Sequence, residues 1–275
     1  MFLIPNAFNV LMSVEGRSSL SREGKREPEF ESSDISQNQE SKVRDGFELT
    51  PRSTPRQQMT EAVLFDNDGV LVDTETLFFE VTRQAFGRMG LELTRGIWAA
   101  RYLGEGQPSK EIALFLGGDP ERVAVVLEER NRQYRRVLEQ PPPVRPKVRE
   151  TLTKLHGRVK LAIVTGCDRH QLNLAHASGN LLSFFDVIIT SDDCSHLKPH
   201  PGLYLAATKH LGVRGENCLA VEDSPRGLAA ARAAGIPCVV VPTELTRMLD
   251  FPGALAVEDD ASAALKYTAL PGPSC

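Results

Sequence analysis

The stretch FDNDGVLVDTE, residues 65–75, decides the fold. It continues a short apolar run, Ala62–Phe65, and places two carboxylates, Asp66 and Asp68, directly after that run. Apolar runs without alternation are typical of strands buried on both faces, as in parallel sheets. Acidic side chains are costly beside such a strand unless a cation pairs with them or they take part in chemistry. The segment therefore predicts a reactive, cation-binding loop at the carboxyl end of a buried strand.

Further apolar runs of similar length follow along the chain. They cover residues 159–164, 187–190, 218–221 and 237–241, with a weaker one at 254–257. Helical patterns lie between them at about 147–156, 168–178, 201–211 and 225–234. Strand alternating with helix predicts right-handed βαβ units, and hence an α/β fold with a doubly wound parallel sheet. Ligands bind such open sheets at the carboxyl ends of the strands.

The stretch from residue 74 to residue 144 breaks this rhythm, because it is too long for a single crossover. Its apolar spacing predicts helices at 75–89, 97–103, 109–116 and 120–138. The last of these begins with Asp119 as N-cap and Pro120 at its first position. We expect a small all-helical cap over residues 74–144, inserted into a core formed by residues 59–73 and 145–275.

Residues 1–58 have a different composition. Beyond an apolar start they are rich in serine and charged residues and poor in large apolar ones, so we predict a disordered N-terminal tail. Such a tail could be a regulatory or docking segment or an inert extension. It could also be an artefact of start-site choice, because Met59 directly precedes the first predicted strand.

Composition excludes several classes of protein. A net charge of −4 argues against a dedicated nucleic-acid binder, and the apolar runs are far too short to span a membrane. The five cysteines form no C-x-x-C pair and have no histidine spacing, which argues against a disulfide framework or a zinc site. We therefore expect a cytoplasmic protein, a monomer or a weak dimer, with no nucleic-acid or membrane partner.

A second acidic pair, Glu222 and Asp223, follows another predicted strand and should converge with Asp66 and Asp68 at the same sheet edge. Either pair alone could be a turn or a helix cap. Two pairs of like charges so close together favour a bound divalent cation, and oxygen ligands indicate Mg²⁺ or Ca²⁺.

Two further segments could hold phosphate at this edge. Thr165 and Gly166 end the second predicted strand, where a hydroxyl and a glycine amide make a fair phosphate cradle. Lys198 precedes Pro199 on a loop after the third strand and could neutralise phosphate charge. Taken singly, a strand-end turn and a solvated surface lysine are the simpler interpretations.

Together these segments resemble the haloacid-dehalogenase (HAD) superfamily, in its phosphatase and beta-phosphoglucomutase-like branch. The matching order is Asp66-x-Asp68, Thr165, Lys198-Pro199 and Glu222-Asp223-Ser224, and the resemblance covers about residues 61–250. It implies a Rossmann-like core with a helical cap. The usual Thr-Ser or Thr-Asn pair is Thr165-Gly166 here, so one side-chain contact is missing.

The resemblance also implies roles. Asp66 is the nucleophile that forms an aspartyl-phosphate, and Asp68 is the general acid and base, whose backbone carbonyl also ligates Mg²⁺. Glu222 and Asp223 complete the metal site with Asp66. The transferring phosphoryl group is held by Thr165, Gly166 and Lys198. We add two candidate substrate contacts: Arg169, which begins the helix after Thr165, and Lys110, on the 104–110 loop of the cap.

Several phosphoryl and related chemistries compete. Asp68 argues against a dehalogenase and a phosphonoacetaldehyde hydrolase, whose relatives lack that second aspartate. Hexose-phosphate mutases carry a His-x-x-Ala-Trp pattern where this chain has Phe78 to Thr82. We therefore predict a Mg²⁺-dependent phosphatase acting on a small phosphorylated metabolite, a sugar phosphate or similar ester. A beta-phosphoglucomutase-like mutase is the first alternative, and a catalytically silent HAD-like binding protein is the second.

Overall fold

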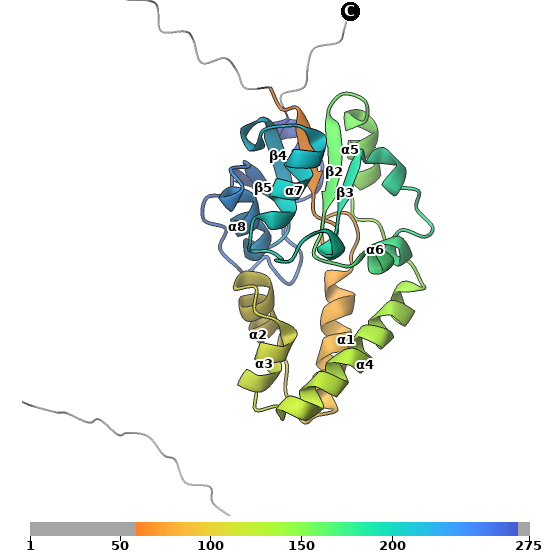
Figure 1. Ribbon diagram of the computed structural model, residues 1–275, viewed down its shortest axis with the longest axis vertical. Helices are drawn as coiled ribbons and strands as arrows, with labels where there is room; N and C mark the ends of the chain where they lie inside the picture. The colour runs from red at the N-terminus through yellow and green to blue at the C-terminus, as the bar shows by residue number, and fades with distance from the viewer. Residues whose placement is uncertain (1–58, 269–275) are drawn as a thin grey trace, which may run out of the picture. The chain divides into compact units, whose positions relative to one another are not determined.

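The computed structural model describes residues 59–268, so the tail expected at 1–58 lies outside the described residues. Within them a parallel sheet has the strand order β3-β2-β1-β4-β5-β6 (Figure 1). The strands are β1 (Ala62–Phe65), β2 (Lys160–Val164), β3 (Val187–Ile189), β4 (Cys218–Glu222), β5 (Cys238–Val240) and β6 (Ala256–Val257). This order, with the chain winding outward in both directions from β1, confirms the predicted doubly wound α/β fold.

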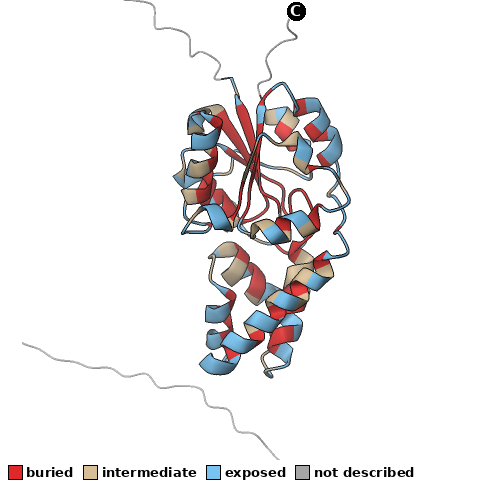
Figure 2. Ribbon diagram, turned by 45° about the vertical axis from the view of Figure 1, so that its right-hand side comes forward, coloured by how far each residue is buried: buried red, intermediate tan, exposed pale blue. Residues whose placement is uncertain are grey.

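Helices cover both faces of the sheet, and this explains why its strands are apolar throughout. In β1, Val63 and Phe65 face one apolar cluster, whereas Ala62 and Leu64 face the other. The first cluster includes residues of α5 (Val148–Leu155), α6 (Arg169–Ala175) and α9 (Ala263–Tyr267). The second includes residues of α7 (Gly202–Leu211) and α8 (Pro225–Ala233). Figure 2 shows the buried strands between these helices.

The segment between β1 and β2 is helical, as expected. Its helices are α1 (Glu75–Gly87), α2 (Arg95–Ile97), the π-helical η1 (Trp98–Gly104), α3 (Ser109–Phe115) and α4 (Pro120–Leu138). We call residues 75–138 the cap helices. They pack around a separate apolar cluster, which includes Phe79, Trp98 and Ile112 and is joined by Leu245 from the core. Asp119 caps α4 by accepting a bond from the Arg122 amide, as its sequence position predicts.

One expected cap helix, at 97–103, differs in form. It is a single α-helical turn followed by η1, in which the amide of Glu105 bonds the carbonyl of Ala100, five residues back. This wider turn carries Trp98 into the cluster of the cap helices and stacks it on Tyr102, with ring centroids 3.9 Å apart.

The chain leaves and re-enters the core through two adjacent segments. Val72 and Val144 form an antiparallel bridge, and the amide of Asp73 bonds the carbonyl of Pro143 at 3.1 Å. On the other side of the bridge, the amide of Arg145 bonds the carbonyl of Leu71 at 2.9 Å. The cap helices are thereby held beyond the carboxyl ends of β1 and β4 (Figure 1).

The remaining short elements are the 3₁₀ turns η2 (Leu182–Phe184), η3 (Ser191–Asp193) and η4 (Gly215–Asn217). The described cysteines, Cys167, Cys194, Cys218 and Cys238, are free thiols. Between residues 59 and 268 no helix combines the length and the apolar character that crossing a bilayer requires.

Candidate active site

Three carboxylates meet at the carboxyl edge of the sheet. Asp66 follows β1, and Glu222 and Asp223 lie at the end of β4, which pairs with β1 in the register Phe65 to Val221. One oxygen of each carboxylate lies within 4.8 Å of the other two, and all three residues are buried. The convergence expected from the sequence is therefore present, because neighbouring parallel strands end side by side.

Lys198 is the cation inside this cluster. Its ammonium lies 2.9 Å from Asp66 Oδ1 and 2.6 Å from Glu222 Oε1, and it donates to the carbonyl of Val164 at 2.8 Å. Burial works to lower the pKa of Lys198, but Asp66 and Glu222 outweigh it and raise that pKa above its ordinary value. Lys198 is therefore held as an ammonium beside Asp66.

One ammonium does not balance three buried carboxylates. Burial raises the pKa of Asp66 to about 8, and Lys198 opposes this while Glu222 and Asp68 add to it. Burial, together with the charges of Glu75 and Asp66, also raises the pKa of Asp223 well above its ordinary value. The cluster thus lacks positive charge, and a divalent cation would supply it and keep the carboxylates ionised.

The geometry fits such a cation. Among the described residues, Asp223 Oδ2 and Glu222 Oε2 are buried without a hydrogen-bond partner. A side chain at Gly69 would collide with the Asp223 carboxylate, and one at Gly227 would collide with that of Glu222. Carboxylate oxygens held in place with a lone pair free are the donors that Mg²⁺ takes. The residues present therefore fit the metal that the sequence implies.

Asp68 lies beside this cluster with both of its oxygens fixed by hydroxyl groups. Thr74 Oγ1 donates to Oδ1 at 2.5 Å, and Thr165 Oγ1 donates to Oδ2 at 3.0 Å. The Thr165 hydroxyl in turn accepts from the amide of Cys167 at 3.2 Å. Thr165 thus orients Asp68, in addition to lying beside Gly166 at the end of β2.

A cavity of about 780 Å³ lies between the core and the cap helices. This volume suits a small molecule. From the core it is lined by Asp66, Asp68, Gly166, Lys198 and Arg226, and from the cap by Phe78, Tyr102, Lys110, Arg130 and Tyr134, among others. Asp66 and Lys198 therefore connect the buried acidic cluster to a cavity whose far wall belongs to the cap.

The two candidate substrate contacts differ in where their side chains lie. Lys110 lines the cavity, although it lies in the first turn of α3 and not on the loop expected there. Arg169 instead donates to the carbonyl of Ile188 at 2.9 Å and to Asp193 at 3.2 Å, and it is not part of the cavity lining. The structure thus gives Arg169 a role in joining α6 to the β3 edge, in place of the expected substrate contact. A side chain in the first turn of a helix can point into the cavity or toward a neighbouring element. The ion pair with Asp193 directs the side chain of Arg169 toward the β3 edge.

Sequence reasoning missed a cation and its acid at the cap–core boundary. Arg226, at the start of α8, lies 3.4 Å from Glu75 Oε1 and stacks on the ring of Tyr102 at 4.3 Å. Burial raises the pKa of Glu75 to about 7, although Arg226 opposes it. Glu75 belongs to the stretch that decides the fold and could have been noticed. No local pattern singles out Arg226, which has the features of an ordinary helix start.

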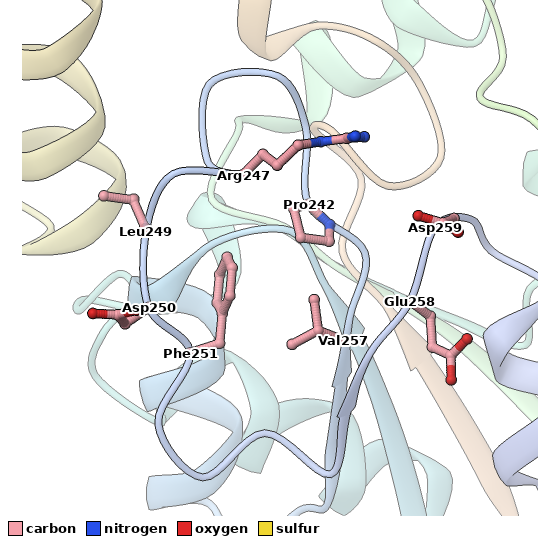
Figure 3. Close-up of a pocket in the computed structure, with 8 residues that line it drawn as sticks. All are labelled: Pro242, Arg247, Leu249, Asp250, Phe251, Val257, Glu258 and Asp259. Atoms are coloured by element: carbon pink, nitrogen blue, oxygen red, sulfur yellow. The ribbon is translucent and has the colours of Figure 1, made fainter.

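A second, smaller cavity of about 380 Å³ is lined by residues of the segment after β5 (Figure 3). Its lining includes Pro242, Arg247, Phe251 and Asp259, and it shares no residue with the first cavity. None of the predicted site residues faces it, so we place the chemistry in the larger cavity.

The comparisons with known proteins agree with this geometry. A family model described as haloacid dehalogenase-like hydrolase matches residues 63–241, which is more than half of the chain. The chain belongs to this family. The matched range contains Asp66, Thr165, Lys198 and Asp223.

The relatives of this HAD-like hydrolase include named phosphatases. It is 34% identical to the phosphorylated carbohydrates phosphatase of Thermotoga maritima over 181 residues, 64% of this chain and 82% of that protein. It is 33% identical to the protein CbbY (plasmid) of Cupriavidus necator over 218 residues, 72% of this chain and 84% of the other. The chain is thus an enzyme of a hydrolase family that includes named phosphatases.

A solved structure shows the same architecture with a ligand. A CbbY variant from Rhodobacter sphaeroides in complex with xylulose 1,5-bisphosphate matches with a TM-score of 0.59 and 26% identity. The match covers 74% of this chain and 95% of that chain. The described part of this HAD-like hydrolase therefore shares the overall arrangement of that protein.

Proposed function

We propose that this HAD-like hydrolase is a Mg²⁺-dependent phosphatase that hydrolyses a small phosphate monoester, a sugar phosphate or similar metabolite, through a phosphoryl group carried on Asp66. The observation that supports this most is the buried cluster of Asp66, Glu222 and Asp223 with Lys198 inside it. Asp66 and Lys198 of this cluster also line a cavity of small-molecule size. The names of the relatives support the ester class.

The first step is attack by Asp66. Lys198 holds Oδ1, so Oδ2 is the oxygen that forms a bond to phosphorus while the ester bond to the leaving oxygen breaks. Asp68, held by Thr74 and Thr165 on either side, gives its proton to that leaving oxygen. In the second step Asp68 takes a proton from water, which attacks the phosphorus and frees Asp66.

In phosphoryl transfer, the barrier is lowered mainly by neutralising the charge on the transferring group. Lys198, Thr165 and the amide of Gly166 would hold the phosphoryl oxygens. Mg²⁺ bound by Asp66, Glu222, Asp223 and the carbonyl of Asp68 would supply the positive charge that lets an anionic nucleophile approach an anionic ester. The unpartnered oxygens of Glu222 and Asp223 support this placement.

The residue at the position where the mutases carry histidine favours transfer of the phosphoryl group to water over its transfer to a second sugar oxygen. Phe78 occupies it here and packs on Tyr134, with ring centroids 4.9 Å apart. An apolar ring cannot exchange a proton with a sugar hydroxyl, so nothing at this position would activate a second acceptor. A silent binding protein is disfavoured because Asp66, Asp68, Lys198 and Asp223 are all present.

Hydrolysis of p-nitrophenyl phosphate by the purified chain, with Mg²⁺ and with EDTA, tests the proposal. We expect turnover with Mg²⁺, none with EDTA, and recovery when Mg²⁺ is added back. Asp66→Asn should lower kcat by at least about 1,000-fold, because the nucleophile is lost. Asp250→Asn, at an exposed acid outside this cavity, is the matched control and should retain full activity.

Three results would contradict the proposal. Absence of turnover on a broad panel of phosphate esters would favour the binding protein. Conversion of a sugar 1-phosphate to its 6-phosphate without release of inorganic phosphate would favour the mutase. Activity of Asp66→Asn equal to that of the parent would remove Asp66 as the nucleophile.

A further inference from the structure

A buried arginine lines the cap side of the cavity. Arg130 lies in the middle of α4 and is 6% exposed. Its Nη1 donates to Thr82 Oγ1 at 2.8 Å and to Ser109 Oγ at 3.2 Å, and its Nε donates to Asn131 Oδ1 at 2.9 Å. All of these acceptors are neutral. Its Nη2 has no hydrogen bond within residues 59–268.

This guanidinium has no acidic partner within the described part of the chain. Its further compensation there comes from the ring of Phe78, whose centroid lies 4.4 Å from the guanidinium carbon, and from Tyr102 and Tyr134, which act to raise its pKa. A buried charge without a counter-charge is costly. Burial accordingly lowers the pKa of Arg130. Hydroxyl and amide acceptors alone could be served by a neutral donor, so they do not account for a charged one.

The other buried cations of the cavity differ from Arg130 in this respect. Lys198 is paired with Asp66 and Glu222, and Arg226 is paired with Glu75. Lys110, next to Ser109 in the sequence, lines the same wall and has no ion pair among the described residues. Both cations on the core side of the cavity are therefore paired with acids, whereas Arg130 and Lys110 on the cap side have no acidic partner among the described residues.

We propose that Arg130 binds a second anionic group of the substrate, a phosphate or a carboxylate, at the end away from the phosphorus that Asp66 attacks. This inference rests on the proposed phosphatase function and narrows its substrate class to bisphosphates and phosphorylated acids. The free Nη2 and the fixed plane of the guanidinium suit two parallel bonds to such an oxyanion. Lys110, more exposed, adds charge at the rim.

The parent enzyme gives the first test, which no folding defect can disturb. With Mg²⁺, kcat/KM is measured on matched pairs: a sugar bisphosphate against its monophosphate, and a phosphorylated sugar acid against the neutral phosphorylated sugar. In at least one pair, we expect kcat/KM to be at least tenfold higher for the member that carries the second anion. The pair that shows this difference tells whether the second anion is a phosphate or a carboxylate. Equal or better turnover of both singly phosphorylated members would overturn the proposal.

The second test asks whether Arg130 is the cause. Arg130→Met keeps an extended side chain and removes its charge. Arg130→Lys keeps the charge and removes the planar guanidinium that can form two parallel bonds. We expect Arg130→Met to lower kcat/KM about 10- to 100-fold on the doubly anionic substrate, mainly through KM, and less than threefold on p-nitrophenyl phosphate. Arg130→Lys should recover part of the loss. Arg136→Met, at an exposed arginine on the same helix, should change neither.

The outcomes separate this inference from the proposed function. If neither p-nitrophenyl phosphate nor any ester of the panel is hydrolysed, the proposed function fails. If they are hydrolysed but Arg130→Met lowers kcat/KM equally on both members of a pair, Arg130 only joins the cap helices, and the inference fails while the phosphatase stands.

Discussion

Gly227 lies where no side chain fits, because the carboxylate of Glu222 fills the space that a Cβ would take. Glu222 cannot move aside freely, since Lys198 and Tyr204 hold its other oxygen at 2.6 Å each. Gly227→Ala should therefore displace a carboxylate of the proposed metal site. We expect kcat/KM on p-nitrophenyl phosphate to fall about 100-fold, with a raised Mg²⁺ requirement.

Gly87→Ala is the matched control for this substitution. Gly87 is exposed at the end of α1, and nothing lies within 4 Å of the point that a Cβ would occupy there. Alanine at this position should leave activity unchanged and stabilise the helix slightly. If both variants keep parental activity, the tight contact between Gly227 and Glu222 does not constrain the site.

His176 supports the loop that carries the nucleophile, and its protonation should affect stability. It is buried, its Nε2 lies 2.7 Å from Asn67 Oδ1, and burial lowers its pKa. Below its ordinary value of about 6.5 the unfolded chain takes up a proton that the folded one resists. This site therefore stabilises the fold fully above pH 6.5 and progressively less as the pH falls below it.

The measurement is the melting temperature between pH 7.5 and pH 5, for the parent and for His176→Gln. We expect a smaller loss on acidification in the variant, because glutamine does not titrate. The difference between the two curves isolates His176 from the carboxylates. Parallel curves would show that His176 contributes nothing to the pH dependence.

At the scale of elements, the first turn of α3, which follows η1 after residues 105–108, forms part of the cap side of the cavity. Lys110 lines the cavity there. Lys110→Ala should raise KM for a doubly anionic substrate by severalfold more than it changes KM for p-nitrophenyl phosphate, which has no anionic group besides its phosphate. Lys209→Ala, on an exposed face of α7, is the control. Equal effects on both substrates would remove Lys110 from substrate recognition.

The elements themselves were largely predictable. Each predicted strand is present within a residue or two, because apolar runs between polar ends define buried parallel strands locally. The N-cap and proline at 119–120 likewise located the start of α4. The π-helical form of 98–104 was not predictable, since it depends on how Trp98 packs among the other cap helices.

At the scale of the whole molecule, all the predicted site residues lie within residues 59–268. A chain that starts at Met59 should therefore have the kcat/KM of the full-length protein, within about twofold. Parallel kinetics on p-nitrophenyl phosphate, with matched melting curves, check this. A tenfold loss on truncation would show that residues 1–58 take part in activity.

The amino-acid sequence by itself determined the fold class, the polar residues at the ends of the strands and the meeting of Asp66 with Asp223. These follow from local rules: apolar periodicity sets the strands, and parallel strands bring their carboxyl ends to one edge. Only the tertiary structure decided which charges are paired. Arg169 turns to Asp193, Arg226 meets Glu75, and Arg130 lies buried without an acid among the described residues. The reason is physical: ion pairing depends on distances between segments remote in sequence, and packing alone sets those distances.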